Sequence, residues 1–229
     1  HLMGVLNVTP DSFSDGGRYL DPDAAIRHAA RMIEEGVDII DIGGESSRPA
    51  GPYGEGAQLV DVEEETRRTV PVIESILSQF DIPISIDTVK PAVASHAIDA
   101  GAVIVNDIGG LRNPDMRSLI AQSGASVVIM HMQGTPGTMQ SAPTYSDLIG
   151  EVSEYLISAA QAAESAGIPK EKIALDPGLG FGKTYDHNFE IIRNLKTFAS
   201  FGYPVLVGPS RKTFVGLDYK LPPSQREEG

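Results

Sequence analysis

The sequence predicts an α/β fold in which buried parallel strands alternate with helices. Seven short apolar runs each end in polar and glycine residues, at positions 2–8, 37–42, 82–86, 102–105, 126–130, 173–175 and 203–207. Continuously apolar strands indicate burial on both faces, which is typical of a parallel sheet. Helical patterns fill the intervals, so the chain consists of βα units joined by right-handed crossovers.

Six helices are predicted between the strands. The first begins at Asp21-Pro22-Asp23, has alanine and isoleucine at helical spacing, and stops at Gly36. The others cover residues 62–79, 91–100, 114–123, 145–166 and 186–199, and the last four of these end at or near a glycine. Strand and helix therefore alternate from the first residue.

Seven βα units predict an eight-stranded TIM-type barrel, a fold of about 250 residues. An open, doubly wound sheet is the alternative, but the first turn has no G-x-G-x-x-G fingerprint. We expect one barrel domain over residues 1–229, truncated after the seventh strand, with the last strand and helix supplied by a longer protein. Such a barrel would expose two sheet edges. The polar residues follow the strands, at the end where barrel active sites lie.

Composition narrows the function classes. With 18 basic and 31 acidic side chains the net charge is −13, which argues against nucleic acid or an anionic membrane as partner. An anionic substrate must then be bound by a local cluster of donors. The chain has no cysteine, which excludes disulfides and thiol chemistry. No apolar run approaches the ~18 residues of a membrane span and no signal peptide is apparent, so we expect a cytoplasmic protein.

The polar residues at the strand ends are the candidate binding residues. Asp176 follows the run at 173–175 and begins a glycine-rich stretch that ends at Lys183. This arrangement puts opposite charges at the same end of the sheet. Asp87 and Asn106 end two other runs. Two acids and an amide that meet over a barrel mouth can bind a flat, nitrogen-rich heterocycle, because a carboxylate offers two adjacent acceptors. Each of the three alone could instead cap the following helix.

Three further features are less specific. Arg211 and Lys212 follow the seventh run and could bind phosphate or a ring carbonyl, although a solvated charge pair is common. The loop from Asn7 to Asp11 has an amide and a carboxylate that suit Mg²⁺, but polar turns of this kind are frequent. His131, between two methionines, favours a structural histidine over a metal ligand.

Taken together, six motifs closely resemble the dihydropteroate synthase family, in the right order and over nearly the whole chain. They are NVTPDSFSDGG (7–17), GGESSRP (43–49), SIDT (85–88), NDIGG (106–110), DPGLGFGK (176–183) and SRK (210–212). The resemblance implies a (β/α)₈ barrel of folate biosynthesis. It implies condensation of 6-hydroxymethyl-7,8-dihydropterin diphosphate with 4-aminobenzoate, which gives 7,8-dihydropteroate and pyrophosphate.

The resemblance also implies a role for each matching residue. The residues that would hold the pterin are Asp87, Asn106, Met130, Asp176 and Lys212. The residues on two loops that would close over the site are Phe13, Asp15, Ser47, Arg48 and Pro49. The residues that would line the aminobenzoate pocket are Phe181, Lys212 and Thr213. Asn7 would bind the Mg²⁺ that accompanies the diphosphate, and the implied catalytic residues are Asp15, Asp176 and Lys212.

The family further implies a homodimer and inhibition by sulfonamides that mimic aminobenzoate. The chain departs from the family pattern in three ways: the Arg-x-His pair of the last strand is absent, Ser47 stands where threonine is common, and the loop at 50–61 is longer than usual. Two other functions stay open. One is a pterin-binding module without catalysis, and the other is a pterin-dependent methyltransferase that acts with a corrinoid protein.

Overall fold

The structure is a computed structural model, and it describes residues 1–9, 22–45, 60–134, 138–139 and 142–216. Six parallel strands form one sheet in sequence order, from β1 to β6. They are β1 Met3–Asn7, β2 Ile39–Gly43, β3 Ile84–Asp87, β4 Ile104–Asp107, β5 Ser126–Met130 and β6 Ile173–Asp176. Consecutive parallel neighbours require a crossover after every strand, as in a βα barrel.

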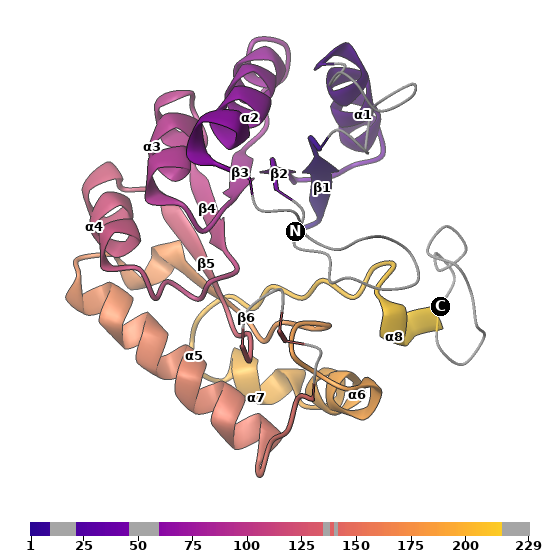
Figure 1. Cartoon of the computed structure of the whole chain (residues 1–229), viewed down its shortest axis with the longest axis vertical. Helices are drawn as coiled ribbons and strands as arrows, with labels where there is room; N and C mark the ends of the chain where they lie inside the picture. Colours follow the sequence, from indigo (N-terminus) through magenta and orange to yellow (C-terminus); the bar gives the residue numbers. More distant parts are fainter. Residues whose placement is uncertain (10–21, 46–59, 135–137, 140–141, 217–229) are drawn as a thin grey trace.

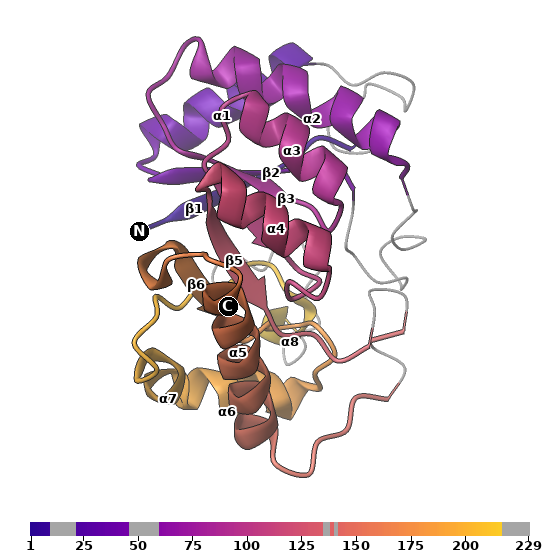
Figure 2. The same ribbon diagram turned by 90° about the vertical axis from the view of Figure 1, so that its left-hand side faces the viewer.

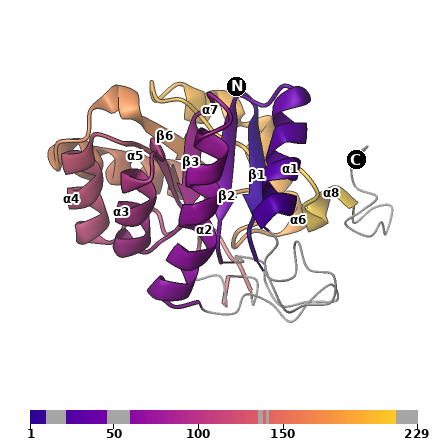
Figure 3. The ribbon, with the colours of Figure 1, turned by 90° about the horizontal axis from the view of Figure 1, so that it is seen from above.

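Helices occupy the crossovers. They are α1 Pro22–Glu34, α2 Val62–Leu77, α3 Pro91–Asp99, α4 Pro114–Ser123, α5 Leu148–Ser165, α6 Tyr185–Arg193, α7 Leu195–Ala199 and α8 Thr213–Gly216. Figure 1 shows α2 to α5 in a row outside the curved strands, and Figure 2 shows them from that outer side. From above, α1 to α4 run side by side along the sheet (Figure 3). None of the described helices is long and apolar enough to cross a membrane.

One apolar core lies between the sheet and these helices. Ile40, Ile42, Ile84 and Ile86 of the central strands are completely buried against helix residues such as Ile73. A strand that is apolar at successive positions can be covered on both faces, which is why the sequence shows runs and no alternation. At the edge formed by β1, by contrast, Val5 is 57% exposed, and among the described residues β1 pairs with β2 alone.

The predicted seventh strand, at 203–207, is reduced to a single bridge. Val205 pairs in parallel with Leu175 of β6, and Leu175 N donates to Pro204 O at 2.9 Å. Leu206 N donates to Leu175 O at 2.9 Å. Pro204 has no N–H to donate, which limits the ladder on this side of β6. The segment still lies beside β6, as the βα order requires.

Two helix boundaries also differ from prediction. The helix predicted at 145–166 begins at Leu148, because Asp147 accepts a hydrogen bond from Gly150 N and so caps it. The helix predicted at 186–199 is two helices that meet at Asn194, whose backbone leaves the helical region with φ −107° and ψ 17°. Tyr145, freed from the helix, donates from its hydroxyl to Gly182 O at 2.7 Å.

Candidate active site

The register of the sheet places three polar side chains in one row at the carboxyl ends of the strands. Asn7 pairs with Gly43, Gly43 with Asp87, and Asp87 with Asn106. A Cβ on Gly43 would lie 3.5 Å from Asn7 Oδ1 and 3.7 Å from Asp87 Oδ2. Gly43 itself therefore places no side chain between the Asn7 amide and the Asp87 carboxylate.

The other half of the site comes from β5, β6 and the segment after the isolated bridge. Met130 pairs with Asp176 across the two strands, and the Asp176 carboxylate accepts from Gly178 N at 2.7 Å. Lys212 Nζ donates to Leu179 O and lies 4.3 Å from the centre of the Phe181 ring. A cation above an aromatic face is attracted by the ring quadrupole, so Phe181 helps to fix this ammonium.

The charges of both halves act on Lys212. Burial lowers the pKa of its ammonium, while Asp176 and Asp87 raise it. The pKa of Asp176 is raised by burial, and Lys212, the Gly178 N–H and Lys183 oppose that rise. Asp87 of β3 and Asp176 of β6 thus both raise the pKa of the same lysine, although 89 positions separate them in the sequence.

Asp87 lies in the most acidic part of the site. Burial raises its pKa well above the ordinary value, and four neighbouring acids add to the rise: Asp41, Glu65, Asp107 and Glu45. A carboxyl in this setting gains from a ligand that offers N–H donors or positive charge, because either one favours its ionised form. A flat heterocycle with an amino group beside a ring N–H would supply such donors.

Asp41 is a site residue that the sequence reasoning missed. It is buried within β2, and its Oδ2 accepts from Asn106 Nδ2 at 3.0 Å. Burial raises the pKa of Asp41, whereas Ser85 and Asn106 lower it. Because the amide nitrogen of Asn106 is bonded to Asp41, its amide oxygen is left to accept from a ligand. The available signal was a single acid inside an otherwise apolar strand, which requires a buried partner.

The predicted metal ligand, Asn7, has an exposed side chain at the end of β1. Among the described residues, no group of three His, Cys, Asp or Glu side chains could hold a metal ion. Mg²⁺ commonly binds one or two protein oxygens together with substrate phosphates. Asn7 Oδ1 beside the open space at Gly43 fits one such donor. Asn7 is thus one described residue that could supply an oxygen ligand to a Mg²⁺ bound mainly by substrate phosphates.

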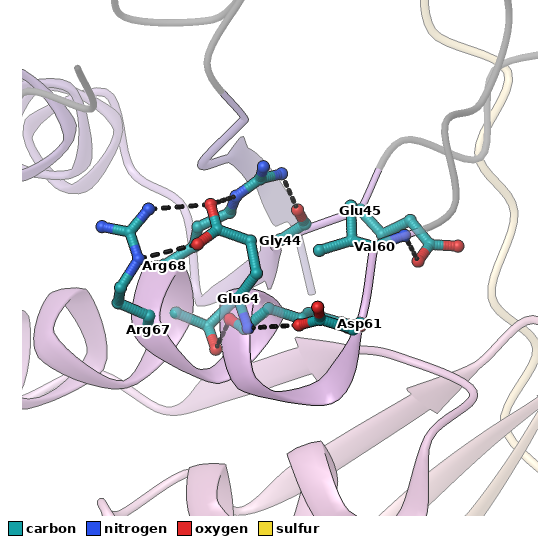
Figure 4. A network of polar contacts seen from close by, with 9 residues as sticks. Gly44, Glu45, Val60, Asp61, Glu64, Arg67 and Arg68 are labelled. Carbon is teal, nitrogen blue, oxygen red and sulfur yellow. Dashed lines mark hydrogen bonds and ion pairs between the residues drawn. The ribbon is translucent and has the colours of Figure 1, made fainter. Parts of the chain in front are cut away.

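Several predicted residues lie outside the described part of the chain: Phe13, Asp15, Ser47, Arg48, Pro49 and the side chain of Thr213. The described residues that flank 46–59 are joined to each other and to α2 (Figure 4). Glu45 Oε2 accepts from Val60 N at 3.0 Å, and Arg68 Nη1 donates to Gly44 O at 2.9 Å. Arg68 also pairs with Glu64 one turn earlier.

The chain matches the family model described as "Pterin binding enzyme" over residues 3–229. It is 48% identical to dihydropteroate synthase from Escherichia coli strain K12, over all of this chain and 79% of that protein. It is 45% identical to dihydropteroate synthase from Bacillus subtilis, over all of this chain and 76% of that protein.

Solved structures give the same result. Yersinia pestis dihydropteroate synthase in complex with a sulfonamide drug superposes with a TM-score of 0.90 at 45% identity, covering 98% of this chain and 80% of that one. Xanthomonas albilineans dihydropteroate synthase with 4-aminobenzoic acid superposes with a TM-score of 0.89 at 45% identity. The match covers 98% of this chain and 78% of that one. The TIM-type barrel predicted from the sequence is thereby confirmed. The chain belongs to the pterin-binding enzymes and, among them, to the dihydropteroate synthases.

Proposed function

We propose that this chain condenses 6-hydroxymethyl-7,8-dihydropterin diphosphate with 4-aminobenzoate at the rim formed by Asp87, Asn106, Asp176 and Lys212. The observation that carries the assignment is the strand register, which pairs Asp87 with Asn106 and Met130 with Asp176 at the carboxyl ends of the strands. The relatives support the choice of substrates, because solved synthases hold 4-aminobenzoic acid and 7,8-dihydropteroate. Synthases at this level of identity favour the transferase over the corrinoid-dependent methyltransferase.

In this proposal the pterin ring lies across the strand ends. Asp87 and Asp176 accept from its N–H groups, the Asn106 amide oxygen accepts another, and Lys212 donates to a ring nitrogen or carbonyl. Met130, which is 2% exposed beside Asp176, provides an apolar surface for the ring. The pKa of each acid is raised by burial, so binding of donors that favour the ionised form also stabilises the charged site.

The reaction replaces a carbon–oxygen bond with a carbon–nitrogen bond. The bond from the pterin methylene to the diphosphate breaks, and the electron pair leaves with the diphosphate. The aromatic amine attacks the methylene cation and then loses a proton. Bound Mg²⁺ would neutralise charge on the diphosphate, with Asn7 as its protein ligand. The amine is already a nucleophile, so the chain's main contribution is to position the reactants and exclude water.

The remaining assignments also follow the family. Asp15 would stabilise the methylene cation, and Phe13 would close over it. Ser47, Arg48 and Pro49 would close from the second loop, while Phe181 and Thr213 would line the aminobenzoate pocket. We further propose that the protein is a cytoplasmic homodimer and that sulfonamides compete with 4-aminobenzoate.

The test is release of pyrophosphate by the purified protein, supplied with both substrates and Mg²⁺. Release that requires both substrates and yields 7,8-dihydropteroate is expected. Folded protein that binds the pterin without turnover would indicate a binding module, and a need for a corrinoid protein would indicate methyl transfer. Removal of Mg²⁺ with a chelator is expected to reduce the rate, and addition of Mg²⁺ to restore it.

Asp176→Asn is expected to weaken pterin binding by about 1–3 kcal/mol, because it removes a charge-assisted hydrogen bond. The dissociation constant of a pterin analogue, measured by calorimetry, reports the change. Asp81→Asn is the matched control, since Asp81 is an exposed acid before β3 and should leave the constant unchanged. Equal affinity of the Asp176→Asn and wild-type proteins would remove Asp176 from the pterin site.

A further inference from the structure

Lys183, at the end of the glycine loop after β6, is a buried cation that the proposed reaction does not use. Its side chain is 3% exposed, and among the described residues it has no carboxylate within ion-pair distance. Its Nζ instead lies 3.0 Å from His131 Nδ1, 3.0 Å from Phe181 O and 3.4 Å from His131 O. A protonated lysine has three donors, so these acceptors satisfy all of them.

His131 is fixed by a backbone hydrogen bond and by two aromatic contacts. Its backbone N donates to Asp176 O at 2.9 Å, and its ring packs edge-on against Tyr155 at 5.1 Å and tilted against Tyr145 at 6.1 Å. Burial, Lys183 and Arg112 together lower the pKa of His131 to about 3. The imidazole is therefore neutral, and with Lys183 as donor its Nδ1 accepts while its Nε2 carries the proton.

The environment of Lys183 is mixed in charge. Burial lowers its pKa to about 7, while Asp176 raises it and Lys212 lowers it further. The charged groups that act on Lys183 are thus the cation Lys212 and the anion Asp176. Arg112 acts on its hydrogen-bond partner, His131. Burial of the lysine ammonium costs free energy because the charge loses its contact with water. The contacts that Lys183 makes must therefore compensate for this cost.

The two segments that Lys183 joins are in direct backbone contact. A Cβ on Gly178 would lie 1.9 Å from His131 O, and a Cβ on Gly182 would lie 2.7 Å from Gln133 O. The glycine loop therefore lies flat against the residues that follow β5. Phe181, in the middle of this loop, packs with Met130, Met132 and Met139 in a small apolar cluster of its own.

We propose that Lys183 is a positioning residue: it fastens the glycine loop to His131 and so fixes Phe181 beneath Lys212, in the wall that receives the aromatic amine. The inference rests on the proposed function, since it assigns Lys183 to recognition of the second substrate. Asp87 and Asn106, which come from β3 and β4, do not depend on this contact, although Lys183 also lowers the pKa of Asp176. Loss of Lys183 should therefore affect 4-aminobenzoate more than the pterin diphosphate.

Lys183→Met keeps the length of the side chain and removes all three donors. We expect the KM for 4-aminobenzoate to rise about tenfold, the scale of one lost charge-assisted hydrogen bond, and the KM for the pterin diphosphate to change less than about threefold. Lys172→Met is the matched control, because Lys172 also donates to a backbone carbonyl, that of Gly124, in a solvent-exposed hydrogen bond. An unchanged KM for 4-aminobenzoate, or equal rises for both substrates, would overturn the proposal.

The nitrogen NMR signals of His131 give a readout that does not depend on turnover. In the wild-type protein we expect an unprotonated, hydrogen-bonded Nδ1 and an imidazole that stays neutral to about pH 3. In Lys183→Met the pKa of His131 should rise, because a nearby positive charge is gone. A protonated Nδ1 in the wild-type protein would overturn the contact even if the variant did not fold. Inactive wild-type protein with the expected His131 signals would refute the proposed function and leave the contact established.

Discussion

Gly178→Ala is expected to lower the free energy of unfolding by about 3–5 kcal/mol and to abolish measurable pterin binding. Gly178 has φ +71°, a conformation that alanine adopts only with strain. The added Cβ would also lie 1.9 Å from His131 O and 3.3 Å from Met130 Cγ. His131 O cannot retreat easily, because the backbone of this residue is bonded to Asp176. The loop must therefore move away from β5 and take Asp176 and Phe181 with it.

Alanine substitutions at two other glycines distinguish the effect of backbone strain at positive φ from the effect of steric overlap of the added Cβ. Gly36 has φ +94° with nothing within 4 Å of its Cβ position, so Gly36→Ala should cost only about 1 kcal/mol. Gly208 has an equally open Cβ position, and its φ lies outside the left-handed region, so Gly208→Ala should be close to neutral. Urea denaturation of the three variants, with a pterin titration, measures these effects. Equal stability of Gly178→Ala and Gly36→Ala would show that the close approach to His131 is relieved elsewhere.

Much of the fold could be predicted from the sequence because buried strands appear there as apolar runs. A strand covered on both faces is mostly apolar, and its polar residues gather where the strand reaches the open end of the sheet. The residues at these ends, among them Asp87, Asn106 and Asp176, were therefore visible as candidates. Their mutual placement was not visible, because it depends on the register, by which Asn7, Gly43, Asp87 and Asn106 form one row.

The residues that were missed are polar groups whose partners are distant in the sequence. Asp41 lies within a strand and acquires its role only because β4 brings Asn106 to it. The sequence predicts Lys183 as a charge at the end of the sheet, but its side chain is buried and contacts His131, 52 positions earlier. The helix break at Asn194 and the shortened pairing at Pro204 are also set by local backbone conformations that apolar periodicity does not encode.

Replacement of a second cation, the half-buried Lys90, is expected to produce a comparably large loss of stability. It lies at the start of α3, and its Nζ is 2.5 Å from Glu45 Oε2 and 2.5 Å from Glu65 Oε2. Glu65 belongs to α2, and its side chain is 1% exposed. Burial lowers the pKa of Lys90, but hydrogen bonds and charge from the two glutamates outweigh this and raise it above 10.5. The ammonium thus links the segment after β2, helix α2 and the start of α3.

Lys90→Met should lower the free energy of unfolding by about 3–5 kcal/mol, because it leaves Glu65 buried without a cation. Lys90→Met combined with Glu65→Gln should recover most of the loss. Lys196→Met, at an exposed lysine of α7, should stay within about 0.5 kcal/mol of the wild-type protein. Urea denaturation of the four proteins measures this, and a Lys90→Met variant as stable as Lys196→Met would contradict it.

The pH dependence of the Lys90→Met effect identifies its origin. The folded pKa of Lys90 lies above its unfolded value, so its contribution to stability is fully present below pH 10.5 and is lost as pH rises through the folded pKa. The difference between wild type and Lys90→Met should therefore shrink as pH rises above that limit. Glu45 and Glu65 also raise the pKa of Asp87, so the same cluster that stabilises the fold sets the charge against which the pterin binds. A difference that stayed unchanged as pH rose through the folded pKa of Lys90 would assign the effect to a group other than this ammonium.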